Sequence, residues 1–571
     1  MVGLISFSLA GCVGTLDKEN GGSGTLVVAD KKEAETTKDK LTSISPEVMY
    51  LLMTAEIAGQ RNRYGVALDG YLEAAKRVDD ARIAERAAKI GLYLKDTEKT
   101  TEAVSLWLEQ DGTNLTARKI AVLSALKGKD KALAISHLNK MLEDDPAGFE
   151  ASLLELTRLS GKESQADFVF DVLEGVAVEH PDQAVVFLVQ SMLAGQLNKI
   201  DVAINKSEKA LLLQPEWDKA LVLHAQLSAQ RGLFEQARVD LEKVLKKSPE
   251  NNKVRRMLGQ VLMKTNAMDQ AIEVYQKILE TEVDDGESQF ALALIYLQQK
   301  KEKEAKVYLK KLVNKKGWNE QASFYLGRIA FKDKQYETAV VWFDKVTLGP
   351  YEYEASMSAV SVLLEQGKFS DAEQRLAGML SQFPKNQINI LLLQAESYTR
   401  QRKYQKSFDI LTDGVRRYPE HRDLLYGRAL IAERVGKLDV LETDLKKILQ
   451  KNPTDIAVLN ALGYTLADRT ERYQEAAEYL ERALELSPEN ALIMDSVGWL
   501  RFKQGRIDAS LTLLRAAYEK QAENEIAAHL AEVLWVSGAE AEAEVVIKKA
   551  LEKSPEDEFL LKFKVRFPQI K

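Results

Sequence analysis

The chain has 571 residues, 45% of them hydrophobic, and its 79 Lys and Arg against 86 Asp and Glu give a net charge of −7 at pH 7. This mildly acidic balance gives no electrostatic reason to expect a nucleic acid as a partner. Twelve prolines and 31 glycines are too few for a loop-rich β protein. The single cysteine excludes an intrachain disulfide and a cysteine-based zinc site. The composition therefore predicts a large, helical, soluble body.

The N-terminus carries a signal of its own. Residues 1–12 form an apolar run that ends in Leu9-Ala-Gly-Cys12, as expected for the end of a secretory signal peptide. This ending resembles the bacterial lipobox, in which the peptide is cut before the cysteine and lipid is attached to it. No Lys or Arg precedes the run, so we expect the true start of the signal peptide to lie upstream of Met1. The alternative is a buried free cysteine in a disordered N-terminus.

The lipobox resemblance makes Cys12 the lipidation site. Two or more acyl chains on one residue anchor a protein stably, since each buried CH₂ contributes about 0.8 kcal/mol. Val13, and not Asp, follows the cysteine, which implies retention at the periplasmic face of the outer membrane. No other segment has the ~18 consecutive apolar residues of a membrane span. We therefore expect the lipid to be the only contact with the membrane.

Residues 13–45 are rich in Gly, Ser, Thr, Lys and Asp and cannot bury enough apolar surface to fold alone. We expect a flexible tether with a root-mean-square span of roughly 30 Å. The alternative is that residues 25–29 (TLVVA) add a strand to a partner.

A repeat of about 34 residues is the strongest signal in the chain. A small residue is followed twelve positions later by a second small residue and four positions after that by a large one, as in Gly259, Ala271 and Tyr275. This spacing resembles the tetratricopeptide repeat. Several units also carry a proline twelve residues after the second small position, where one helix pair stops. The first small position recurs at Ser191, Ala225, Gly259, Ala293, Gly327, Val360, Ala395, Ala429, Gly463, Gly498 and Ala531, and more weakly at Ala55, Gly91, Val122 and Thr157.

The resemblance implies an all-α fold, an α-solenoid whose right-handed superhelix contains about 15 helical hairpins. Each hairpin has apolar surface on two sides, so stacked neighbours form one continuous core. We expect degenerate hairpins over residues 46–183, a regular array over 184–557, and a closing helix and tail over 558–571. Recurrent glycines, such as Gly232 and Gly505, are predicted to form the turns inside hairpins. One extra residue between Gly463 and Ala476 predicts a loop insertion.

Catalytic and cofactor motifs do not emerge from the sequence. None of the five histidines lies within four residues of another, so no helical pair of metal ligands is predicted. We find no Gly-x-Ser-x-Gly elbow and no complete phosphate-binding loop. We therefore expect neither an enzyme, nor a cofactor, nor a small-molecule substrate. A carbohydrate-active enzyme within residues 46–181 is the remaining catalytic alternative.

Candidate partner-binding residues follow from the repeat register. In such superhelices the first helix of each unit lines the concave wall, and the residues three before and one, four and five after the first small position point inward. Aromatic residues at these positions are favoured interface anchors, although such rings also pack between hairpins. The Asn residues of the clamp that some repeats use for chaperone tails are missing. The candidates are Tyr464, Trp499, Phe502, Phe324, Arg328 and Phe331.

Three segments go beyond a generic repeat: residues 460–476 (NALGYTLADRTERYQEA), 494–500 (MDSVGWL) and 513–518 (LLRAAY). With the lipobox and the length, they resemble the LbcA-like outer-membrane lipoproteins of gammaproteobacteria. The resemblance implies a non-catalytic adaptor that binds and activates a periplasmic carboxyl-terminal processing protease and recruits its peptidoglycan hydrolase substrates. The alternative is an assembly factor for envelope export, serving exopolysaccharide, pilus or outer-membrane protein biogenesis.

Overall fold

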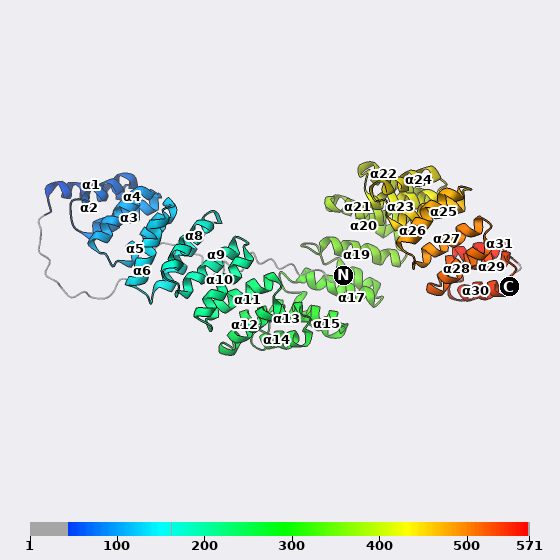
Figure 1. Cartoon of the computed structure of the whole chain (residues 1–571), viewed down its shortest axis with the longest axis horizontal. Helices are drawn as coiled ribbons and strands as arrows, with labels where there is room; N and C mark the ends of the chain where they lie inside the picture. The colour runs from blue at the N-terminus through cyan, green and yellow to red at the C-terminus, as the bar shows by residue number, and fades with distance from the viewer. Residues whose placement is uncertain (1–43, 161–162, 569–571) are drawn as a thin grey trace. The chain divides into compact units, whose positions relative to one another are not determined.

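The computed structural model describes residues 44–160 and 163–568, so Cys12 and nearly all of the expected tether lie outside the described residues. Across the part that it describes, the chain folds into 31 α-helices and one short 3-10 helix (η2, Pro384–Asn386), with no strand. The helices follow one another as hairpins, α1 with α2 through α29 with α30, and α31 closes the series (Figure 1). The predicted all-α repeat fold is confirmed.

Contacts divide the chain into two compact units, and the division falls in the sequence between Tyr308 and Leu309, inside α16. The boundary that we expect between residues 183 and 184 stays a prediction. The helices of the first unit, up to the one at its end, are α1 Pro46–Gln60, α2 Tyr64–Ala75, α3 Ala81–Leu94, α4 Thr97–Gln110, α5 Leu115–Gly128, α6 Lys131–Asp144, α7 Phe149–Ser160, α8 Glu163–Glu179, α9 Ala184–Gln196, α10 Ile200–Leu213, α11 Asp218–Arg231, α12 Phe234–Lys247, α13 Asn252–Lys264, α14 Met268–Thr281, α15 Gly286–Gln298 and α16 Glu302–Leu312.

The second unit carries all six candidate partner-binding residues. Its helices are α17 Asn319–Lys332, α18 Tyr336–Phe343, α19 Glu352–Glu365, α20 Phe369–Gln382, α21 Gln387–Arg400, α22 Tyr404–Arg417, α23 Arg422–Arg434, α24 Leu438–Lys451, α25 Ile456–Arg469, α26 Tyr473–Leu486, α27 Ala491–Lys503, α28 Ile507–Lys520, α29 Asn524–Val536, α30 Glu540–Lys553 and α31 Glu558–Arg566.

The small positions of the repeat are where two helices of a hairpin come closest. A Cβ atom built on Gly259 would lie 2.6 Å from the ring of Tyr275, and one on Gly327 would lie 2.7 Å from the ring of Phe343. Both rings are buried on the second helix of the same hairpin. Any larger side chain would collide with its partner ring, because protein interiors are close-packed. The packing expected from the 34-residue spacing is therefore confirmed at these units.

The predicted turns are also confirmed. Gly232 and Gly505 have φ values of +89° and +76°, in the left-handed region that glycine enters without strain. The extra residue near Gly463 lengthens a helix instead of a loop: α25 ends six residues after Gly463, whereas α27 ends five residues after Gly498. Thr470, which follows α25, is extended and not left-handed.

Candidate partner-binding surface

Three helices of the second unit converge on one face. Although α27 lies between α25 and α29 in the chain, the Tyr464 hydroxyl on α25 donates a hydrogen bond of 3.0 Å to Glu525 Oε1 on α29. First helices of alternate hairpins approach each other only on the inner side of a curved stack. We call this face, formed by α25, α27 and α29, the inner wall.

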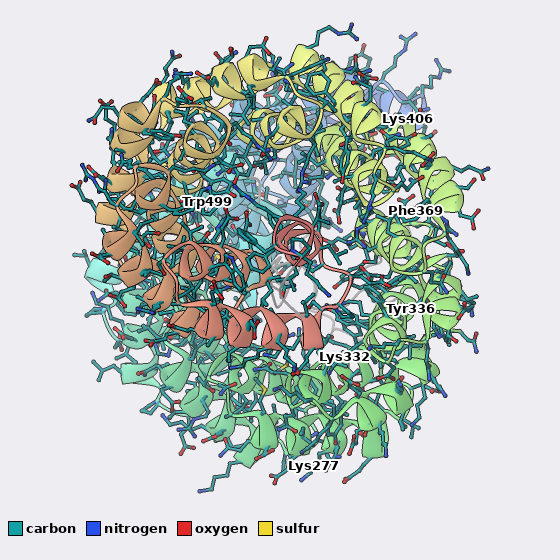
Figure 2. All side chains as sticks on the ribbon, turned by 90° about the vertical axis from the view of Figure 1, so that its right-hand side faces the viewer. Lys277, Lys332, Tyr336, Phe369, Lys406 and Trp499 are labelled. Carbon is teal, nitrogen blue, oxygen red and sulfur yellow. The ribbon has the colours of Figure 1, made fainter. Side chains whose placement is uncertain are left out.

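Trp499 lies at the centre of the inner wall, and its side chain is 4% exposed. Its ring stacks on the imidazole of His529, with centroids 4.2 Å apart and planes at 20°. Its indole N–H donates to Asp468 Oδ1 at 3.0 Å, and Lys503 Nζ lies 5.1 Å from the ring centroid. Phe502 packs beside it at 5.2 Å. Figure 2 shows Trp499 on the inner side of the C-terminal helices, whereas Lys406 lies at the outer edge.

His529 joins the three helices through both ring nitrogens. Nδ1 lies 3.0 Å from Asp495 Oδ2 on α27, and Nε2 lies 3.3 Å from the Tyr464 hydroxyl on α25. Burial by itself lowers the pKa of His529, but the Asp495 carboxylate, followed by Glu525, outweighs it and the pKa is raised. When protonated, the ring can donate to both partners at once.

The pKa values of the neighbouring carboxyl groups are also raised. Burial, and next to it the charge of Asp495, raises the pKa of Glu525, although His529 opposes the shift. Burial also raises the pKa of Glu532, although Arg566 lies 2.6 Å from its carboxylate and opposes the shift. Burial raises the pKa of Tyr464 as well, which keeps its hydroxyl a donor. These shifts reflect carboxyl groups that are held in a region of reduced solvation.

The closing helix α31 reaches this face from the far end of the chain. Besides the pair of Arg566 with Glu532, its Glu558 pairs at 3.0 Å with Arg434, the last residue of α23. These two residues are 124 positions apart in sequence. Helix α31 thus connects α29 to α23, and the predicted closing helix does more than cover the last hairpin.

A second aromatic group lies on α17 and at Tyr351, the residue just before α19. Phe324 stacks on Tyr351 with centroids 4.9 Å apart, and Tyr325 lies 5.4 Å from Phe324. The guanidinium of Arg328 lies 5.8 Å from both the Phe324 and Tyr325 rings, within cation–π range. Burial, followed by the nearby Tyr351, raises the pKa of Tyr325.

The structure brings most of the predicted residues together. Tyr464, Trp499 and Phe502 belong to one cluster, and Phe324 lies with Arg328. Phe331 packs against the same hydrophobic cluster as Phe324, and its ring lies 6.1 Å from that of Tyr336. Trp499 and Phe324 are both buried, so packing accounts for most of their surface, while Tyr464, Phe502 and Phe331 are half-buried and Arg328 is exposed. Their role in binding a partner stays a prediction.

Sequence reasoning missed the groups that α29 contributes: Glu525, His529 and Glu532. The signal was available for Glu532, since it follows the small position Ala531 directly and so occupies an inward position. His529 gave no signal, because it lies two residues before Ala531, outside the four inward positions. Its role depends on the curvature that brings α25 and α29 together.

The described residues contain neither a cluster of metal ligands nor a membrane-spanning helix. Over 44–160 and 163–568, no group of three His, Cys, Asp or Glu side chains could hold a metal ion. No described helix is long and apolar enough to cross a membrane.

Comparison with known proteins agrees with the repeat architecture. Tetratricopeptide-repeat sequence patterns match residues 228–295, 286–314, 456–490 and 498–558. A TPR repeat-containing protein of Pseudomonas aeruginosa, PA4667, is 34% identical over 532 residues, which cover 92% of this chain and 89% of that protein.

Two solved structures resemble the chain in fold alone. The APC/C Cut9–Hcn1 hetero-tetramer is 13% identical with a TM-score of 0.32, over 90% of this chain and 89% of that one. YrrB, described as a TPR protein with an unusual peptide-binding site, is 20% identical with a TM-score of 0.27, over 31% of this chain and 90% of that one. The hairpins, their spacing and the full-length relative together show that the chain belongs to the tetratricopeptide-repeat protein family.

Proposed function

We propose that the chain is a non-catalytic, lipid-anchored scaffold that binds and activates a periplasmic carboxyl-terminal processing protease and recruits its peptidoglycan hydrolase substrates. Tetratricopeptide repeats act through protein partners, so the inner wall is the surface to which this function is assigned. In the proposal, Cys12 holds the scaffold at the periplasmic face of the outer membrane.

The observation that carries the proposal is the location of the residues that resemble the LbcA-like lipoproteins. Residues 460–476 and 494–500 form most of α25 and much of α27, which supply Tyr464, Asp468 and Trp499 to the inner wall. A generic repeat needs only the small and large packing positions. These helices add a network of rings and carboxylates to those positions, and aromatic residues are enriched at interface centres.

Tethering supplies the mechanism. A protease and a hydrolase that are bound to one scaffold meet at an effective concentration set by the scaffold and not by the bulk solution. No bond-making group of the scaffold is needed, because the chemistry belongs to the protease.

The test is capture from envelope extracts followed by reconstitution. The full chain should capture a processing protease and increase its cleavage of peptidoglycan hydrolases. Phe502→Ser should weaken both effects, since Phe502 is a half-buried ring of the inner wall. Val545→Ser on α30 is the matched control, because Val545 is 67% exposed on a second helix. Capture of export components without a protease would contradict the proposal and favour an assembly factor.

Localisation is tested separately with Cys12→Ser. We expect the variant to leave the membrane fraction and remain in the periplasm. A variant that stays with the outer membrane would contradict lipid anchoring at this residue.

A further inference from the structure

A hollow of the second unit lies away from the inner wall. It is a groove of about 730 Å³ between the second helices α18 and α20, and Leu363 of α19 is among the residues that line it. Figure 2 shows Tyr336 and Phe369, the first residues of α18 and α20, one above the other along the right-hand side of the view. We call this hollow the outer groove.

The outer groove exists because one helix is short. Helix α18 has 8 residues, whereas α20 and α22 have 14 each. It ends at Phe343, and Gly349, with φ +81°, and Pro350 follow in the connection to α19. The last turns of α20 therefore lack the neighbour that a full-length α18 would provide.

Gly378 on α20 keeps the outer groove open. It lies in the interior of a helix, where glycine is less favourable than alanine. A Cβ atom built there would meet nothing within 4 Å. Packing within the described chain thus gives no reason for glycine at this position, in contrast to Gly327, whose Cβ would collide with Phe343.

The charges around the outer groove neutralise one another. Arg375 makes a two-point ion pair with Asp344, at 2.6 and 2.9 Å. Lys368 Nζ lies 3.7 Å from Glu337 Oε1. These pairs leave little net charge to attract a charged ligand.

The side-chain carbonyl of Gln366, in contrast, can accept a further hydrogen bond. The amide of Gln366 donates to Glu337 at 2.6 Å, yet its carbonyl Oε1 is buried without a hydrogen-bond partner. A buried acceptor of this kind is stabilised when a donor reaches it. Gln374 and Gln382 flank Gly378 on the same face of α20, and apolar Leu363 and Met379 lie between the polar groups.

We propose that the outer groove binds an extended, uncharged segment of a partner polypeptide. From Asp371 to Gln382 the face of α20 that lines the groove is about 16 Å long, which matches about five residues of extended chain at ~3.3 Å each. A backbone N–H of the segment would satisfy the Gln366 carbonyl, and a side chain or the backbone would pack over Gly378. The site is separate from the inner wall and does not depend on the protease proposal.

The test is selection of a phage library of random linear peptides on the full chain, followed by affinity measurement with the enriched synthetic peptides. We expect Gly378→Met, which fills the groove, to weaken their binding about tenfold or more, and Gln366→Leu to weaken it by removing the acceptor. Lys549→Met is the matched control, since Lys549 is the exposed residue at the same repeat position of α30. Its binding should equal that of the wild-type chain.

Thermal unfolding separates binding from folding, because Gly378→Met should melt no lower than the wild-type chain. Failure to enrich any peptide, or equal binding by Gly378→Met, would overturn the proposal. Binding that requires charged peptide residues and collapses in high salt would also overturn it, since the occupant would then be recognised by charge.

Discussion

The inner wall and the outer groove belong to the same unit but differ in how they are filled. Trp499 stacks on His529 and donates a hydrogen bond to Asp468, and helices α25, α27 and α29 meet across the face. Beside Gly378 there is open space, and the Gln366 carbonyl has no partner. A regular hairpin fills its neighbour's groove, whereas a shortened one leaves it open. Truncating a side chain in the inner wall should therefore destabilise the fold, whereas enlarging a side chain in the outer groove should not.

The largest effect is expected from Asp495→Ala. Asp495 is 4% exposed and pairs with buried His529, so its loss leaves a buried imidazole without its counter-charge. Breaking a buried pair in this way costs about 3–5 kcal/mol. Urea unfolding of the full chain should show this loss in the transition of the C-terminal helices. Asp508→Ala, at an exposed position of α28, is the control and should change little. Equal effects of the two variants would show that the cluster adds nothing to stability.

Gly327→Ala should cost about 1–3 kcal/mol, the usual range for overpacking. The new Cβ would lie 2.7 Å from the ring of Phe343, which is buried and cannot move into solvent. Circular dichroism melting provides the measurement. A variant as stable as the wild-type chain would mean that α17 and α18 can separate without loss.

Gly378→Ala should have the opposite sign. Because its Cβ meets nothing within 4 Å, only the helix propensity changes, and the variant should gain about 1 kcal/mol. The same melting experiment applies. A loss of stability would mean that a side chain or backbone group packs against Gly378. The outer groove would then not be open at this position.

The smallest effect is a pH dependence of the inner wall. His529, Glu525 and Glu532 all have pKa values that are raised in the folded chain. A raised pKa means that the folded state holds the proton more tightly than the unfolded state, so the stabilisation is present at low pH and lost as the pH rises. Arg566 and Lys503 are basic groups that face Glu532 and oppose its shift. The urea midpoint of the C-terminal helices should fall from about pH 5 to about pH 8.

The variant His529→Gln should flatten this dependence in its upper part, where the imidazole would titrate. A wild-type midpoint that rises over this range would contradict the direction of the three shifts.

The repeat spacing predicted the fold because hairpin packing is local. Gly259 and Tyr275, or Gly327 and Phe343, are sixteen residues apart, so their contact follows from register alone. The partners of the inner wall are far apart in sequence: Tyr464 and Glu525 are 61 residues apart. Their meeting depends on the accumulated rotation of the stack, which no single unit encodes.

The outer groove escaped prediction for a different reason. The interval between the small positions Gly327 and Val360 is 33 residues, only one below the usual value, so nothing in the spacing indicates that α18 stops at Phe343. Helix α18 ends early, but the connection before α19 is longer. The repeat length therefore stays nearly the same. Helix length, unlike repeat length, is set by which residues find a packing partner.

The close fit between each small residue and the ring of its own hairpin has a mechanical consequence. Gly259 contacts Tyr275 and Gly327 contacts Phe343 within single hairpins. The contact between the two helices of a hairpin therefore does not depend on the neighbouring hairpin. Under a pulling force, the array should therefore unfold one hairpin at a time. The hairpins should refold when the force is removed.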